Sequence, residues 1–211
     1  AGNLTSLVYA AFGKGFKETD KKLLNSPYAQ FLKMTSEVRC LFKVGEKQHI
    51  ATRLMGGILY AYGNQTVAPY SEQFYIGGAN SIRAFTVRSI GPGSYRPEDK
   101  QYGYLDETGD VKLEANVEYR LPILGELDGA AFLDAGNVWL LREQKNEEGE
   151  NIRPGGLLTL RNFAKSIALG TGVGLRYDLT FLVIRLDLGI ALHDPYDTGK
   201  KGYYNIPKFK D

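Results

Sequence analysis

The sequence has few residues suited to metal or redox chemistry, and it has no long apolar run. Of 211 residues, one is a cysteine (Cys40) and two are histidines (His49 and His193). A single cysteine excludes an internal disulfide framework and a thiolate-rich zinc site. No stretch of about 18 apolar residues occurs, which excludes a transmembrane helix. No catalytic constellation surrounds either histidine, so we expect no enzyme activity, no metal and no cofactor.

The sequence also has little net charge. Lys and Arg number 26 against 24 Asp and Glu, which gives a formal charge of +2. This balance argues against a nucleic-acid partner and against a polybasic membrane anchor. Glycine, with 25 residues, and the aromatic residues, at 12%, exceed average usage. Together they indicate an all-β chain with tight turns.

Hydrophobicity alternates with period two along most of the chain. In residues 182–193 every second residue from Leu182 to Leu192 is aliphatic, and those between are polar or small. Such alternation is typical of a strand with one apolar face. It predicts about seven to eight strands, placed at 4–12, 32–44, 49–62, 111–121, 128–141, 166–179 and 182–193, with a weaker pattern at 49–62.

The length of these segments and the charge of their polar faces favour a membrane protein. Strands near ten residues with one wholly apolar face suit a tilted crossing of a bilayer. The opposite face carries charges such as Lys33, Arg120 and Arg176, which the core of a small sandwich would leave unpaired. We therefore predict an antiparallel transmembrane β-barrel. A soluble β-sandwich with one solvated face is the alternative.

Short connections alternate with long ones, and the longest spans residues 63–110. A loop of this length in a compact domain is usually functional. Its middle holds a Gly77-Gly78 pair and a lone Arg83 between Ile82 and Phe85. This pattern predicts an apolar loop tip that carries one buried charge. A surface arginine in a mobile loop is the simpler alternative.

Four blocks resemble a known family in the same order. They are FYIGGANSIRAF at 74–85, VKLEANVEYRLPI at 111–123, AAFLDAGNVW at 130–139 and SIALGTGVGLRYDLTFLVIRLDLGIAL at 166–192. Together they are similar to the barrel of the BamA/TamA-type outer-membrane assembly factors, in the bacterial surface antigen superfamily. The resemblance covers roughly residues 72–196. It departs at Ala84, where the family has glycine, and in the absence of the family's closing aromatic strand.

The resemblance implies a fold and a set of site residues. Residues 1–211 would be the C-terminal portion of the barrel domain in the bacterial outer membrane, without the periplasmic repeat domains and the last strand. The loop 63–110 would fold into the lumen as a lid, and its arginine would pair with acids on the wall. The lid-loop motif would consist of Gly77, Gly78, Ser81, Ile82, Arg83 and Phe85. The partners of Arg83 on the wall would be Asp134 and Glu118. The glycines that leave room for the loop would be Gly170, Gly172 and Gly174.

The resemblance also implies a function. The full protein would fold and insert β-barrel proteins into the outer membrane, with unfolded clients, the lipid bilayer and accessory lipoproteins as partners. Two alternatives stay open: a two-partner-secretion-type transporter that passes one polypeptide through the lumen, and a passive pore in which Arg83 lines a constriction.

Overall fold

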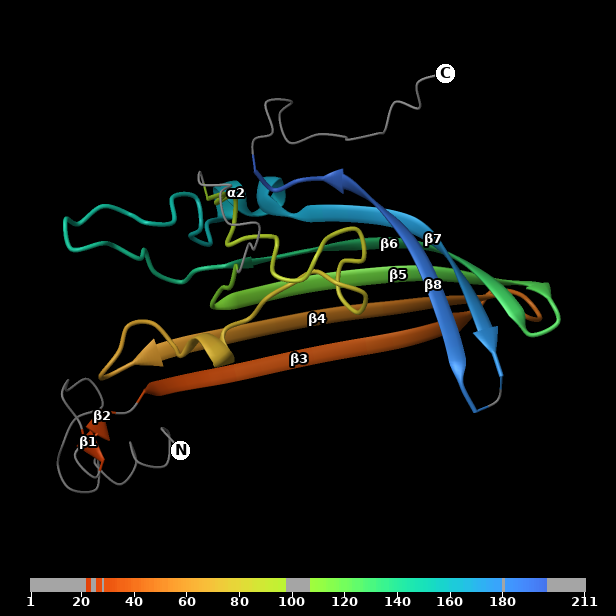
Figure 1. Ribbon diagram of the computed structural model, residues 1–211, viewed down its shortest axis with the longest axis horizontal. Helices are drawn as coiled ribbons and strands as arrows, with labels where there is room; N and C mark the ends of the chain where they lie inside the picture. The colour runs from red at the N-terminus through yellow and green to blue at the C-terminus, as the bar shows by residue number, and fades with distance from the viewer. Residues whose placement is uncertain (1–21, 24–25, 28, 98–106, 180, 197–211) are drawn as a thin grey trace, which may run out of the picture.

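A computed structural model describes residues 22–23, 26–27, 29–97, 107–179 and 181–196. Its main feature is one antiparallel sheet in the order β3-β4-β5-β6-β7-β8 (Figure 1). The strands are β3 Gln30–Lys43, β4 His49–Tyr62, β5 Val111–Leu124, β6 Leu127–Trp139, β7 Ala168–Asp178 and β8 Val183–His193. The remaining elements are the short strands β1 Lys22–Leu23 and β2 Ser26–Pro27, the 3-10 turns η1 Tyr70–Glu72 and η2 Ala164–Ser166, and the helix α2 Leu160–Phe163.

The all-β prediction is confirmed, and six of the seven expected strands are present within a few residues of their expected ends. The seventh, 4–12, lies outside the described residues. Each of the six contains 11 to 14 residues, longer than the usual five or six. Within the part of the chain that the structure describes, no helix has the length and apolar character needed to cross a membrane.

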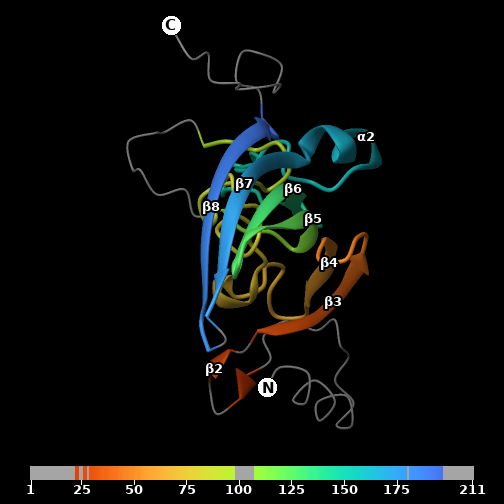
Figure 2. The ribbon, with the colours of Figure 1, turned by 90° about the vertical axis from the view of Figure 1, so that its right-hand side faces the viewer.

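The sheet is strongly curved, and its two faces differ in chemistry. Viewed along the strands it forms an arc, with the loop between β4 and β5 on the inside (Figure 2). Because side chains alternate along a strand, the outer face collects exposed aliphatic residues and the inner face collects charged and small ones. On the outside the following are 44–69% exposed: Leu32, Met34, Val38, Leu54, Val117, Leu133, Val173, Leu186 and Leu188.

Connections at one end of the sheet are short and those at the other end are long. Residues 44–48, 125–126 and 179–182 join the three hairpins, whereas residues 63–110 and 140–167 make the long loops. The β5–β6 turn is tighter than the expected 122–127, because both strands extend to Gly125-Glu126. Such asymmetry is characteristic of outer-membrane barrels.

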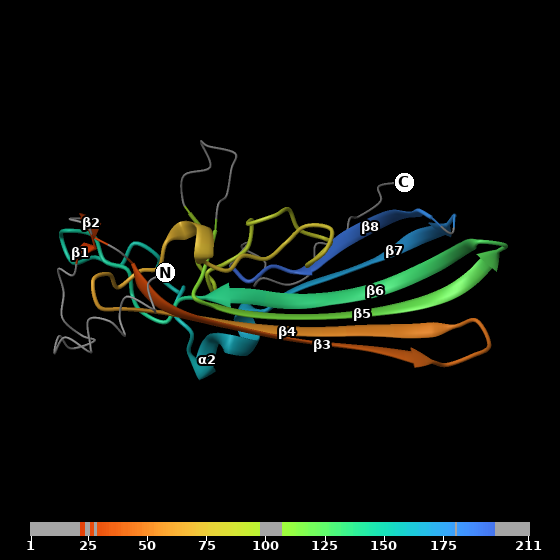
Figure 3. The ribbon, with the colours of Figure 1, turned by 90° about the horizontal axis from the view of Figure 1, so that it is seen from below.

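The apolar core lies between the inner face and the loop. Ile76 and Ile82 of the loop are fully buried, as are Leu59 of β4 and Val138 of β6. Phe74 packs over Gly57, where a Cβ atom would lie 2.5 Å from the ring. The loop therefore fills the concave side of the sheet, which is seen edge-on in Figure 3.

Candidate functional site

The tip of the long loop, residues 76–88, folds back on itself. The Arg88 N–H donates to the Ile76 carbonyl at 2.8 Å, and the Gly78 N–H donates to the Phe85 carbonyl at 2.8 Å. Gly77 and Gly78 have φ of +97° and +90°, a region that favours glycine. A Cβ atom on Gly77 would also collide with the Thr86 carbonyl oxygen. Both glycines of the predicted motif are thus needed to close the tip.

Two further motif residues complete this closed tip. The Ser81 hydroxyl accepts a hydrogen bond from the Gly77 N–H at 3.0 Å. The Phe85 N–H donates to the Ile82 carbonyl at 3.1 Å, which forms the turn that presents Arg83. Ala84 sits in this turn without a positive φ, so alanine in place of the family's glycine introduces no backbone strain.

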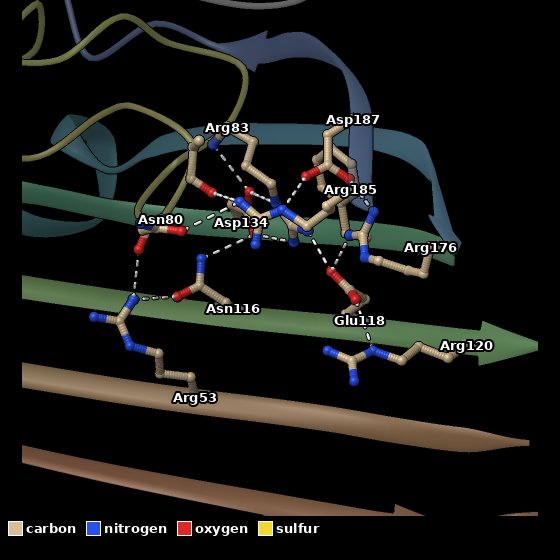
Figure 4. A network of polar contacts seen from close by, with 12 residues as sticks. Arg53, Asn80, Arg83, Asn116, Glu118, Arg120, Asp134, Arg176, Arg185 and Asp187 are labelled. Carbon is tan, nitrogen blue, oxygen red and sulfur yellow. Dashed lines mark hydrogen bonds and ion pairs between the residues drawn. The ribbon is translucent and has the colours of Figure 1, made fainter. Parts of the chain in front are cut away.

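Arg83 lies against Asp134, which is fully buried on the inner face of β6 (Figure 4). The guanidinium donates through Nε to Oδ2 and through Nη2 to Oδ1, both at 2.9 Å. The Arg83 backbone N–H adds a bond to Oδ2 at 3.0 Å. The ring of Phe132 lies 3.5 Å beneath the guanidinium carbon. This is bidentate, charge-assisted pairing with an added cation–π contact.

Glu118 of β5 accepts from three arginines (Figure 4). Arg83 reaches its Oε2 through Nη1. Arg176 of β7 reaches the same oxygen at 3.0 Å, and Arg120 reaches Oε1 at 2.8 Å. Arg176 also pairs with Asp187 of β8 at 2.6 Å. The Arg83 latch, meaning Arg83 with Asp134 and Glu118, is therefore part of a network that spans β5 to β8.

Burial makes the Arg83 latch sensitive to the loss of any of its three members. The side chains of Arg83, Glu118 and Asp134 are 7%, 9% and 0% exposed. Burial acts to lower the pKa of Arg83, but the hydrogen bonds to Asp134 and Glu118 outweigh it and raise the pKa above its ordinary value. The guanidinium therefore stays charged. Removing one partner of such a buried pair typically costs about 3–5 kcal/mol.

Side chains of three strands also bind consecutive carbonyls of the loop tip. Arg53 of β4 donates to the Asn80 carbonyl at 3.0 Å. Asn116 of β5 donates to the Ser81 carbonyl at 2.8 Å. Arg185 of β8 donates to the Ala79 carbonyl and, at 3.2 Å, to the Asn80 side chain. A cavity of about 630 Å³ adjoins these groups. The loop tip thus connects β4 to β8 across the inner face.

Only one of the three predicted glycines receives the loop. A Cβ atom on Gly170 would lie 2.6 Å from the Ala84 Cβ. At Gly172 a Cβ atom would instead collide with the Leu188 carbonyl oxygen and lie 2.5 Å from the Phe132 ring, and at Gly174 it would meet the Asp187 carboxylate. Gly189 of β8 also lies under Ala84 of the loop, because a Cβ there would meet the Ala84 Cα at 3.0 Å. The expectation that Gly172 and Gly174 make room for the loop is therefore not met, because backbone and side-chain atoms of the wall itself lie nearest to a Cβ at both positions.

The later part of the loop has a second anchor near the end of β6. The Gly93 N–H donates to the Val138 carbonyl at 2.7 Å. The buried Asn137 side chain donates to the Gly93 carbonyl at 2.8 Å and to the Ser166 carbonyl. The Trp139 indole N–H donates to the Ser166 hydroxyl at 2.9 Å. The sequence did not predict the loop contacts made by Asn137, Arg53, Asn116 and Arg185.

Comparison with known proteins agrees with this geometry. The Omp85 superfamily domain matches residues 24–205. The outer membrane protein assembly factor BamA of Neisseria meningitidis serogroup B is 32% identical over 88 residues, which are 39% of this chain and 11% of that protein. A crystal structure of BamA from Haemophilus ducreyi lacking POTRA domains 1-3 matches with a TM-score of 0.54 at 16% identity, covering 76% of this chain and 31% of that one.

These matches differ in how much of the chain they cover and in what they establish. At 16% identity the structural match shows the fold alone, which is part of a BamA barrel. The chain spans about a tenth of the curated relative and a third of the solved one. The family match covers most of the chain. The chain therefore belongs to the Omp85 superfamily, which confirms the predicted BamA/TamA-type barrel and its place in the outer membrane of Gram-negative bacteria.

Proposed function

We propose that the protein containing this chain folds and inserts β-barrel proteins into the outer membrane. The observation that carries the proposal is the Arg83 latch. Through Arg83 and the carbonyls of residues 79–81, the loop bonds to side chains of β4, β5, β6 and β8. A loop bonded to four strands holds the curvature of the wall and fills part of the lumen. This arrangement supports an assembly factor better than a freely open pore.

The proposed mechanism involves no bond chemistry. A strand at an opened barrel seam would offer its unpaired backbone groups to a client strand, which would add by β-augmentation. The added client strand would satisfy these backbone groups, because each backbone polar group left without a hydrogen bond in lipid costs several kcal/mol. The latch would keep the wall rigid on one side while the seam opens on the other. Unfolded barrel clients, the bilayer and accessory lipoproteins are the partners of this proposal.

The test is a folding assay with the full-length protein in liposomes. The measured quantity is the rate at which an unfolded barrel client acquires its heat-resistant compact form. We expect acceleration over empty liposomes, and a large part of it lost with Arg83→Ala. Arg39→Ala is the matched control, because Arg39 is an exposed arginine of the inner face that pairs with Glu37. No acceleration by the unmodified protein would contradict the proposal.

A polypeptide transporter is the second candidate, because the lumen borders a cavity of about 630 Å³ with arginines on its wall. A transporter would pass one client through the lumen without speeding the folding of others. The same liposomes would then protect an added client from external protease. A passive pore would show a single-channel conductance that changes with Arg83→Ala and no effect on clients.

A further inference from the structure

A short helical stretch lies on the outer side of the sheet, at the end with the long loops. α2 and η2 run without a break from Leu160 to Ser166. Figures 2 and 3 both place α2 outside the arc, on the side opposite the loop between β4 and β5. The polar network of the latch therefore does not involve it, and its environment is the outer face.

The apolar side of this stretch is only partly covered by protein. Leu160, Phe163 and Ala164 share one face, because residues three and four apart are neighbours on a helix. The Phe163 ring stacks on Trp139 of β6, with centroids 5.2 Å apart at 27°. This contact fixes the orientation of the helical stretch. Leu160, one turn earlier on the same face, is 101% exposed.

The polar side of the stretch is cationic. Arg161 and Lys165 are both exposed and lie on the side away from Phe163. No acidic residue occurs in the sequence between Glu150 and Asp178. Within the described part of the chain neither cation forms an ion pair. A fully exposed leucine beside such cations is the composition of a segment that lies in a membrane interface.

The position along the barrel also matches an interface. Leu133, at the middle of β6, is 46% exposed on the outer face. Trp139 is six residues further along the strand, about 20 Å at roughly 3.4 Å per residue. For a strand tilted by about 40°, this is roughly 15 Å along the membrane normal, or half of a hydrocarbon core about 30 Å thick. Trp139 and α2 thus lie where the apolar belt ends.

We propose that residues 160–166 are an interfacial anchor in the outer leaflet. Leu160 inserts among the acyl chains, and Arg161 and Lys165 contact anionic lipid headgroups. This stretch lies on the same outer side of the sheet as the exposed apolar residues Leu133 of β6 and Val173 of β7, so the occupant is the lipid that already surrounds the barrel. The anchor ties the end of β6, through Trp139 and Ser166, to a fixed membrane depth. It rests on the family's outer-membrane location and is independent of the proposed insertion activity.

Depth-dependent quenching tests the position of Leu160. In the full-length protein Cys40, the single cysteine of this chain, is replaced by serine, as is any cysteine outside it, and Leu160→Cys carries a polarity-sensitive fluorophore. Folded protein is placed in vesicles whose lipids bear a nitroxide either near the headgroup or deep in the chain. Leu186→Cys, 66% exposed on β8, is the control within the apolar belt. Glu147→Cys, exposed in the same long loop, is the control in water.

The expected pattern distinguishes three environments. The label at 160 is quenched several-fold more by the shallow nitroxide than by the deep one, the label at 186 shows the reverse, and the label at 147 is quenched by neither. A label at 160 that behaves like the one at 147 would overturn the anchor. Binding of another protein at this face would give that same aqueous result in pure lipid vesicles.

A second arm tests the headgroup contact. Phosphatidylcholine vesicles are compared with vesicles that also contain anionic phosphatidylglycerol. Shallow quenching of the label at 160 should rise with anionic lipid, and the double change Arg161→Gln with Lys165→Gln should abolish the rise. Lys145→Gln, an exposed cation in the same loop, should leave the rise unchanged. Equal quenching in both lipids would overturn the proposed headgroup contact.

Discussion

Arg83 binds the carboxylate of Asp134 with both its main chain and its side chain. The backbone N–H and Nε donate to one oxygen at 3.0 and 2.9 Å, and Nη2 donates to the other at 2.9 Å. Asp134 also accepts from Asn116 at 2.9 Å. A single buried carboxylate therefore fixes the path of the loop as well as the orientation of its arginine.

Asp134→Asn should release the loop tip while keeping the shape of the side chain. Arg83 would face a neutral, partly donating group in a buried site, at a cost of about 3–5 kcal/mol. We expect amide hydrogen exchange in peptides covering residues 79–88 to accelerate by roughly 100-fold or more, as that energy implies. Glu143→Gln, at an exposed ion pair, is the control. Unchanged protection in Asp134→Asn would show that the backbone turn holds the tip without the latch.

Glu118→Gln should destabilise the barrel far more than Arg120→Gln. Loss of the Glu118 charge leaves the buried Arg83 and Arg176 each short of a partner, which should cost about 3 kcal/mol. Arg120 is 45% exposed, and losing an exposed ion pair typically costs under about 1 kcal/mol. Urea unfolding in lipid vesicles measures both. Equal losses of unfolding free energy would mean that Glu118 acts as an ordinary surface partner of Arg120.

The strands and the latch could be predicted from the sequence for physical reasons. Period-two alternation is enforced along a wall between lipid and water, so the approximate extent of the strands and the inward face of Glu118 follow from it. The inward face of Asp134 is only a condition of the predicted pairing. The apolar neighbours of Arg83 signalled burial, and the resemblance supplied the partners. The structure then places Arg83 between the two predicted carboxylates.

The other loop contacts carry no comparable signal. Arg53 and Arg185 bind backbone carbonyls, which every residue possesses. Whether these two side chains can reach the loop depends on the stagger and curvature of the sheet between β4 and β8, which alternation does not encode. The same limit explains the glycines. Gly172 and Gly189 are direct partners in the pairing of β7 with β8, and alternation does not tell which of two paired glycines lies under the loop.

Arg53 and Arg185 should together hold β4 and β8 at a fixed separation. Each binds the loop tip from an opposite side, at Asn80 and Ala79 respectively. We expect Arg185→Gln to broaden the distance distribution between spin labels at Leu54 and Leu186, which are exposed on the outer face of these strands. Arg39→Gln is the control on the same inner face. An unchanged distribution would mean that the sheet keeps its curvature without the loop tip.

Gly170→Ala should displace the loop, and Ala84→Gly should restore it. The new methyl group would lie 2.6 Å from the Ala84 Cβ, too close for any real pair, so the turn holding Arg83 would be pushed off Asp134. Removing the Ala84 methyl leaves Ile82 Cγ2 at 3.4 Å as the next neighbour, an ordinary contact. Hydrogen exchange of residues 79–88 and client folding should both return toward the unmodified values in the double variant. Gly56→Ala, with nothing within 4 Å, should change neither. If the double variant stayed as perturbed as Gly170→Ala alone, the cause would lie in the β7 backbone and not in the contact between the loop and the wall.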